Sequence, residues 1–302
     1  MAETLEISGD QKVAIAHAMS EHTAPFISAI NRVISDEWNS TADDPSARAL
    51  GTGSFVELRG KPYLITNEHV AMERRRVSLA HALRQGDDPD NRAFRIINPF
   101  QVIGAPTDAA ISRIEDDVWE QGQKMAIPAV RIACAHEPVP GERLFVQGFP
   151  GEFTRATSFL PGNVARPVAF LTEEIELPER LDAEFYFALH YSPEWARTAG
   201  NVSVNLPLPS GFSGSFVWDT KYVRVRGRNW TPRDAVVTGL LRAWPQGEHA
   251  NRLLGVRIEV VRAFLMRALR LEAAYFRSLN RQKHSGDALS DWLWAERTIT
   301  DL

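Results

Sequence analysis

Between residues 49 and 256 the sequence alternates short apolar runs with turns, and this pattern constrains the fold more than any other feature of the chain. The runs are SFVELRG, PYLITN, FRIINP, DAAISRIE, AVRIACA, ERLFVQGFP, PVAFLTEEIEL, EFYFALHY, GSFVWD, YVRVRG and AVVTGLLRAW. Many short strands with Gly, Pro and Asp turns between them are typical of an antiparallel barrel or sandwich. We therefore predict a mostly β body.

Helical patterns flank this body on both sides. Residues 9–38 carry apolar residues at roughly helical spacing, interrupted by Pro25. After residue 256 the period becomes helical again, with an apolar stripe through Val260, Phe264, Leu265, Leu269, Ala273 and Phe276. The final WLWAERTITDL is typical of a short helix or a docked segment.

These patterns divide the chain into three parts. We predict a helical N-terminal extension over residues 1–45, a β domain over 46–256, and a C-terminal helix and tail, packed on that domain, over 257–302. A chain of 302 residues, 44% hydrophobic and 24% charged, is long enough to bury a sizeable core. Its net charge of -4 disfavours non-specific nucleic-acid binding.

Composition also limits the compartment and the cofactors. The N-terminus carries acidic residues where a signal peptide needs basic ones, and no run of about 18 apolar residues occurs, so we expect a cytoplasmic protein without a membrane span. The single cysteine, Cys134, excludes a disulfide within this chain, and its apolar surroundings predict a buried core thiol. No Cys and His cluster has zinc spacing, so we expect neither metal nor cofactor.

Three segments of the β body each carry a residue type that acyl-transfer chemistry uses. GTGSFVELRGKPYLITNEHVA leads to His69, APTDAAISRIE contains Asp108, and PSGFSGSFVWD contains Ser213. A serine hydroxyl is a poor nucleophile at neutral pH, so it needs an imidazole to take its proton and a carboxylate to orient that imidazole. A glycine before the serine lets the turn present the N–H groups of Gly211 and Ser213 to an oxyanion.

Each of these residues also has a simpler interpretation. His69 fits a solvated turn, and Ser213 fits a tight turn before a strand. Asp108 fits a turn residue, and Asp116 and Asp117 compete with it as the carboxylate. Because those two follow the apolar strand that Asp108 precedes, we favour Asp108.

The chain resembles the chymotrypsin-fold serine proteases, and their cysteine-poor bacterial trypsin-like and HtrA-like branch more than the secreted digestive enzymes. The motifs stand in the family's order: GTGSFVE with LITNEHV, TDAAISRI, GERLFVQGFPGE, GFSGS, and VVTGLL followed by LLGVRIEVVRAFL. The resemblance covers residues 50–270 and implies two antiparallel six-stranded β-barrels, with the active site in the cleft between them.

The resemblance also implies a serine endopeptidase that hydrolyses peptide bonds through an acyl-enzyme. It makes Ser213 the nucleophile, His69 the general base and acid, and Asp108 the orienting carboxylate, with an oxyanion hole formed by Gly211 and Ser213. A protein or peptide is then the substrate. The alternative is a catalytically silent module of the same fold that binds a partner peptide or protein.

The primary substrate pocket follows from the same resemblance. Its predicted walls are Leu206, Pro207 and Leu208 on one side and Thr238, Gly239 and Leu240 on the other. No acidic residue stands among them, so we expect an apolar or small residue before the scissile bond.

One departure from the family bears on control. Phe212 stands where relatives that mature from zymogens carry an aspartate. We therefore expect no activation by N-terminal cleavage. A regulatory protein partner that docks on the terminal helices is the means of control that we predict instead.

Overall fold

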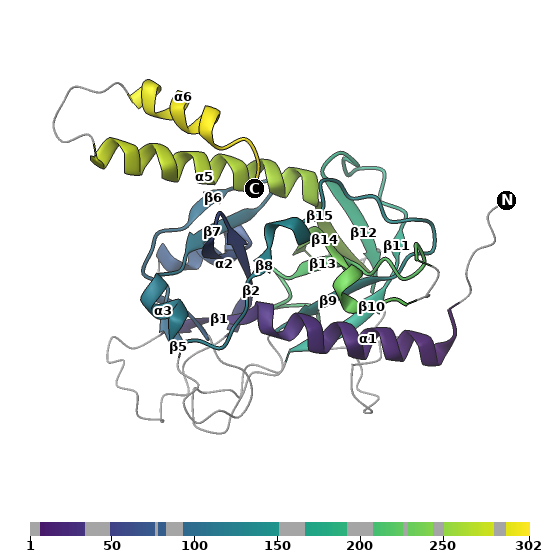
Figure 1. Ribbon diagram of the computed structural model, residues 1–302. Helices are drawn as coiled ribbons and strands as arrows, with labels where there is room; N and C mark the ends of the chain where they lie inside the picture. Colours follow the sequence, from purple (N-terminus) through teal and green to yellow (C-terminus); the bar gives the residue numbers. More distant parts are fainter. Residues whose placement is uncertain are drawn as a thin grey trace.

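Two largely antiparallel sheets form the body of the molecule, with helices along the outside (Figure 1). This computed structural model describes residues 7–33, 49–75, 78–82, 93–150, 167–191, 208–225, 229–243, 251–280 and 288–302. The prediction of a mostly β fold with an N-terminal and a C-terminal helix is confirmed.

The first sheet has eight strands in the order β5-β4-β1-β2-β3-β7-β6, with β8 paired to β2. The strands are β1 (Ile27–Val33), β2 (Ala49–Leu58), β3 (Lys61–Thr66), β4 (Ser78–Ala82), β5 (Ala93–Arg95), β6 (Gln101–Ile103), β7 (Ala109–Arg113) and β8 (Ile127–Pro128). Arg59 and Gly60 join β2 to β3 with φ angles of 53° and 72°, the left-handed conformation that a tight two-residue hairpin turn requires.

The second sheet has seven strands in the order β10-β9-β13-β14-β15-β12-β11. The strands are β9 (Leu144–Gly148), β10 (Val168–Thr172), β11 (Glu174–Ile175), β12 (Tyr186–His190), β13 (Phe216–Asp219), β14 (Val236–Ala243) and β15 (Arg252–Arg257). The sheets thus contain eight and seven strands, where the resemblance implied six each. The N-terminal strand β1 and the two-residue strands β8 and β11 add to the count.

The N-terminal segment is only partly helical, which corrects the prediction of helix over residues 9–38. Helix α1 (Gly9–Thr23) begins with a capping box between Ser8 and Gln11 and gives way to the 3₁₀ helix η1 (Ala24–Phe26), which contains Pro25. The chain then forms β1, which pairs with both β2 and β4. Spacing alone suggested a helix, but backbone pairing on both sides makes this segment an inner strand of the first sheet.

Two of the predicted strands, in AVRIACA and YVRVRG, do not form in the described residues. In AVRIACA, residues 129–131 form the 3₁₀ helix η3 (Ala129–Arg131), which leaves Ile132 buried and Cys134 exposed, so the prediction of a buried thiol is wrong. In YVRVRG, the buried Glu142 carboxylate accepts hydrogen bonds from the backbone N–H groups of Val223 and Arg224 at 3.0 Å each. A side chain therefore takes the donors that a strand would give to its neighbour.

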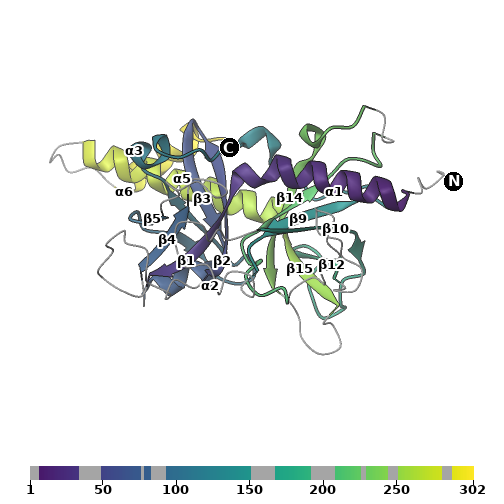
Figure 2. The ribbon, with the colours of Figure 1, turned by 90° about the horizontal axis from the view of Figure 1, so that it is seen from below.

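The C-terminal helix α5 (Ile258–Asn280) lies against β14 and β15 of the second sheet and against β7 of the first (Figures 1 and 2). Its buried face, which includes Val261 and Leu265, belongs to a core shared by both sheets. Helix α6 (Ala288–Thr298) packs on α5, where the Arg277 guanidinium lies 4.8 Å from the Trp294 ring centroid. None of the described helices combines the length and the apolar character that crossing a membrane requires.

Short helices complete the described part of the chain. They are α2 (Glu68–Met72), η2 (Glu73–Arg75), α3 (Asp116–Glu120) and η4 (Pro232–Asp234). Of these, α2 matters most for the site, because it directly follows β3 and carries His69.

Candidate active site

Ser213 lies in a tight turn just before β13, between two glycines with positive φ angles. The φ angle is 100° at Gly211 and 90° at Gly214. A Cβ atom on Gly214 would collide with the backbone oxygen of Thr52 and the hydroxyl of Thr66. The second glycine is therefore required both by its backbone conformation and by the close approach of the first sheet.

Thr52 of β2 fastens this turn to the first sheet. Its N–H donates to the Ser213 carbonyl oxygen at 2.8 Å, and its hydroxyl donates to the Gly211 carbonyl oxygen, also at 2.8 Å. The same hydroxyl accepts a hydrogen bond from the Phe149 N–H at 2.9 Å. Sequence reasoning used the GTG motif only for its resemblance and missed this role of the threonine.

The N–H groups of the turn divide into two sets. The N–H groups of Phe212, Gly214 and Ser215 donate to backbone carbonyls at 2.9–3.1 Å. Within the described part of the chain, the N–H groups of Gly211 and Ser213 have no hydrogen-bond partner. These two donors are therefore available to an anion, as an oxyanion hole requires.

Phe212 is fully buried and anchors the turn in the core of the second sheet. Its ring packs edge-on against Phe170, with centroids 5.5 Å apart and an interplanar angle of 87°. The position where zymogen-type relatives carry an acidic residue thus holds a core aromatic ring.

His69 and Asp108 form a pair on the first sheet. Asp108 Oδ2 lies 2.8 Å from His69 Nδ1, and Asp108 Oδ1 accepts a hydrogen bond from the His69 backbone N–H at 3.1 Å. Asn67, the residue before α2, donates from its amide to the Asp108 carbonyl oxygen at 2.7 Å. The carboxylate is buried, whereas the imidazole is half exposed, so one face of the ring remains open to a substrate.

The two competing carboxylates lie elsewhere. Asp116 pairs with Lys61 at 2.9 Å and with Arg113 at 3.4 Å. The hydrogen bond from Lys61 holds the pKa of Asp116 below its usual range. Asp117 is exposed at the start of α3. Among the three candidates, Asp108 is the one with a contact to His69.

The Ser213 hydroxyl points toward the second sheet. Its Oγ donates to the Arg242 carbonyl oxygen at 3.4 Å, and among the hydrogen bonds of the described residues none joins it to His69. The fold therefore brings the three residues to the boundary between the sheets and makes the contact between imidazole and carboxylate. A rotation about the Cα–Cβ bond of Ser213 would release its hydroxyl from β14.

Arg242 and Tyr186 also contact this site, and the sequence analysis did not find them. Arg242 Nε lies 3.5 Å from Asp108 Oδ2, and Arg242 Nη1 donates to the Tyr186 hydroxyl at 3.0 Å. The Tyr186 hydroxyl donates to the Pro106 carbonyl oxygen at 2.8 Å. The only signal in the sequence is a charged residue inside the otherwise apolar run TGLLRAW.

The structure describes four of the six residues predicted to line the substrate pocket. Leu206 and Pro207 lie outside the described residues, and Leu208 is exposed. Thr238 and Leu240 are buried, and the hydroxyl of Thr238 lies 2.8 Å from His136 Nδ1.

The third residue of that wall is also in the interior. A Cβ atom on Gly239 would lie 2.6 Å from the Phe187 ring. The side of β14 that meets the Ser213 turn is further along the chain, where Gly214 donates its N–H to the Leu241 carbonyl oxygen at 3.1 Å. The residues beside Ser213 are therefore Leu241 and Arg242.

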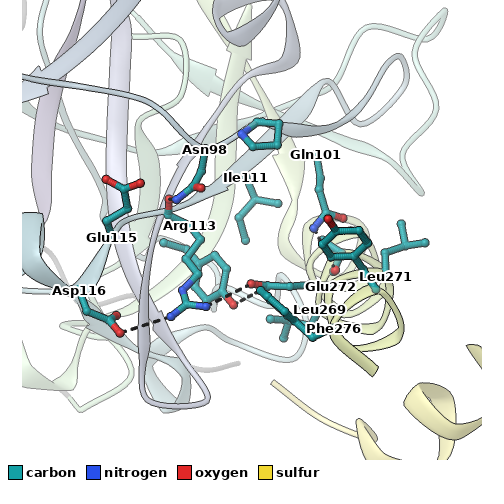
Figure 3. Close-up of a pocket in the computed structure, with 14 residues that line it drawn as sticks. Asn98, Gln101, Ile111, Arg113, Glu115, Asp116, Leu269, Leu271, Glu272 and Phe276 are labelled. Atoms are coloured by element: carbon teal, nitrogen blue, oxygen red, sulfur yellow. Dashed lines mark hydrogen bonds and ion pairs between the residues drawn. The ribbon is translucent and has the colours of Figure 1, made fainter. Parts of the chain in front are cut away.

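A separate cavity of about 670 Å³ lies between α5 and the β6–β7 hairpin (Figure 3). Figure 3 shows Arg113 between Asp116 and Glu272, and its guanidinium lies 3.8 Å from the Glu272 carboxylate. Burial and a hydrogen bond to the same glutamate raise the pKa of Tyr63. The cavity contains none of the three proposed triad residues. No group of three or more His, Cys, Asp or Glu within the described ranges is placed to hold a metal ion.

The sequence profile of the trypsin-like peptidase domain matches residues 51–227, more than half of the chain. The chain belongs to this family, and the resemblance to chymotrypsin-fold serine protease domains is confirmed. No curated protein matches the chain.

Several solved structures are similar in fold. They include the HtrA-type protease AlgW with a decapeptide, at 14% identity over 84% of this chain and 66% of that chain, with a TM-score of 0.46. The MamO protease domain from Magnetospirillum magneticum shares 10% identity over 81% and 98%, with a TM-score of 0.45. An inactivated protease paralogue of the scabies mite shares 11% identity over 82% and 95%, with a TM-score of 0.47.

Proposed function

We propose that the protein is a serine endopeptidase that works through an acyl-enzyme. The observation that carries the proposal is the hydrogen bond between His69 and Asp108 at the boundary where the Ser213 turn presents two N–H groups that have no partner among the described residues. Membership of the trypsin-like peptidase family supports it. The proposed substrate is a protein or peptide.

The proposed reaction begins when the Ser213 hydroxyl leaves the Arg242 carbonyl and turns to His69. The oxygen attacks the scissile carbonyl carbon while His69 Nε2 takes its proton, and the Asp108 carboxylate, bonded to Nδ1, stabilises the imidazolium. The N–H groups of Gly211 and Ser213 stabilise the oxyanion. His69 then gives the proton to the leaving amine, and water hydrolyses the acyl-enzyme by the same route.

Labelling with a fluorophosphonate probe tests the nucleophile. We expect the wild type to be labelled at Ser213, and Ser213→Ala to lose both labelling and peptide cleavage, because no other group replaces the attacking oxygen. Ser210→Ala is the matched control, since this exposed serine lies in the same turn and has no proposed role. A folded wild-type protein that neither labels nor cleaves, with or without candidate activators, would refute the enzyme and favour the catalytically silent, partner-binding alternative.

We further propose that a protein partner on the terminal helices controls the enzyme. A buried phenylalanine at residue 212 supports control by a route other than zymogen cleavage. Helix α1 is also in contact with the half of the molecule that carries the nucleophile. Thr23 and Ser20 of α1 hydrogen-bond to Gln147 of β9, and β9 pairs with β13, which follows the Ser213 turn.

A further inference from the structure

Arg242, near the end of β14, contacts two members of the proposed triad. Its carbonyl oxygen accepts the hydrogen bond of the Ser213 hydroxyl at 3.4 Å. Its Nε lies 3.5 Å from the Asp108 oxygen that binds His69 Nδ1 at 2.8 Å. The Arg242 side chain is 26% exposed and the Asp108 side chain 9%, so water screens this pair only partly.

Tyr186 holds the other end of the guanidinium. Arg242 Nη1 donates to the Tyr186 hydroxyl at 3.0 Å, and the guanidinium carbon lies 5.4 Å from the ring centroid. The same hydroxyl donates to the carbonyl oxygen of Pro106 at 2.8 Å. Pro106 and Asp108 belong to the loop between β6 and β7. Two side chains of the second sheet therefore contact the loop of the first sheet that carries the carboxylate.

The Nε atom of Arg242 depends on Asp108 for a charge partner. It is buried and makes no hydrogen bond among the described residues. The Asp108 carboxylate is almost fully buried, so removing Arg242 takes away a charge that offsets it and leaves the backbone N–H and the imidazole of His69 as its partners.

We propose that Arg242 is a positioning residue of the triad, which holds the Asp108 carboxylate in place across the boundary between the sheets and offsets part of its charge. The inference rests on the proposed function, because the position of Asp108 matters for catalysis only if His69 acts as the base. The guanidinium and the imidazole share one carboxylate. A protonated His69 is therefore stabilised by Asp108 and repelled by Arg242.

The ionisable groups around the pair are few. Among the described residues, those in contact with His69 or Asp108 are these two themselves and Arg242, and Tyr186 contacts Arg242. Glu68 and Glu73 lie on the same helical segment as His69, and they remain in every variant compared below.

The experiment follows the titration of His69 by NMR in the intact protein with labelled histidine. Loss of the positive charge in Arg242→Met should move the titration midpoint of His69 up by about 0.5 to 1 pH unit, as expected for one partly screened charge near the ring. Arg242→Lys keeps the charge and should stay within about 0.2 pH unit of the wild type by the same reasoning.

The matched control is Arg257→Met. Arg257 is a similarly half-buried arginine of the same sheet, paired with Glu259 at 2.8 Å, and it has no contact with Asp108 among the described residues. This control should leave the His69 midpoint unchanged. If Arg242→Met fails to fold, Arg242→Gln replaces it, since glutamine lacks the charge and retains a donor for Tyr186.

A folded Arg242 variant without charge whose His69 midpoint equals that of the wild type would overturn the inference. A purely structural role for Arg242 would lower stability and leave the midpoint in place. In an active enzyme, the acid limb of the kcat/KM profile should follow the same shift in Arg242→Met and stay at the wild-type position in Arg242→Lys. A wild type that never cleaves would refute the proposed function, while the NMR midpoints would still test Arg242.

Discussion

The turn that carries Ser213 depends on single residues at positions that other side chains cannot fill. Gly214 approaches Thr52 and Thr66 of the first sheet so closely that even a methyl group has no room. Phe212 fixes the opposite side of the turn in the core of the second sheet. Such a constrained backbone keeps its conformation only because packing on both sides enforces it.

Gly214→Ala should therefore damage both folding and function. We expect the free energy of unfolding to fall by about 1–3 kcal/mol, from the positive φ angle alone, and by more where the clash forces the sheets apart. Urea unfolding measures the loss, and fluorophosphonate labelling should fall with it. Gly104→Ala serves as the control, because a Cβ atom at Gly104 meets nothing within 4 Å. Equal stability and labelling in both variants would contradict this account of the turn.

At the scale of elements, the N-terminal segment divides into two parts that have different structural roles. Strand β1 pairs with β2 and β4 and therefore belongs to the body of the first sheet. Helix α1 packs on the outside, against β9, β10 and η4 (Figure 2). Removing α1 uncovers the core around Ile15 and Met19 but leaves the strand pairing intact, whereas removing β1 would break the sheet.

A truncation series tests the proposed control by α1. Deleting residues 1–23 removes the helix that bonds to Gln147, and we expect cleavage to change at least threefold while the protein stays folded. Deleting residues 1–40 removes β1 as well, and we expect it to abolish folding, because the inner strand leaves its neighbours unpaired. Deleting residues 1–6 is the control. Cleavage equal to the wild type after a clean loss of residues 1–23 would argue against control through α1.

At the scale of the whole molecule, both sheets and α5 share one core, so a change that destabilises one sheet lowers the stability of the entire fold. His81 of β4 is a destabilising residue of the first sheet, where it packs against the separate apolar cluster that contains Phe55. It is buried between Phe94, with ring centroids 6.2 Å apart, and Phe55, at 5.6 Å. Its Nδ1 has no hydrogen-bond partner among the described residues, and burial lowers its pKa to about 3.

Stability should therefore depend on pH through His81. The unfolded chain takes up a proton near pH 6.5 and the folded chain only near pH 3, so acid favours the unfolded state between these values. We expect the free energy of unfolding to fall by up to about 1.4 kcal/mol per pH unit from this group as the pH drops below its unfolded pKa. His81→Phe should remove that slope in urea unfolding from pH 7 to 4.5, and exposed His17→Gln should keep it. Identical slopes in wild type and His81→Phe would show that the folded and unfolded chains protonate His81 at the same pH, which contradicts this account.

Much of the candidate site could be proposed from the sequence because its signals are local. His69 follows an apolar strand, Asp108 precedes one, and the glycines beside Ser213 indicate a tight turn. Each of these residues lies in a short stretch of backbone, and the residues of that stretch favour its conformation. The order of these stretches along the chain was enough to predict the family and the mostly β fold.

Other features depend on contacts between distant segments. The spacing of residues 27–33 fits a helix as well as a strand, and only pairing with β2 and β4 made it a strand. In the sequence, Arg242 is a single charged residue in an apolar run. Only the structure shows that it lies beside Asp108.

The sequence by itself determined the class of fold, the residue types of the candidate site and their order. Local backbone preferences and apolar periodicity depend on residues that are neighbours in the chain. The tertiary structure alone decided that Thr52 fastens the Ser213 turn, that the β14 residues beside it are Leu241 and Arg242, and that Arg242 shares the carboxylate with His69. These contacts join residues far apart in the chain, and packing between the two sheets selects them.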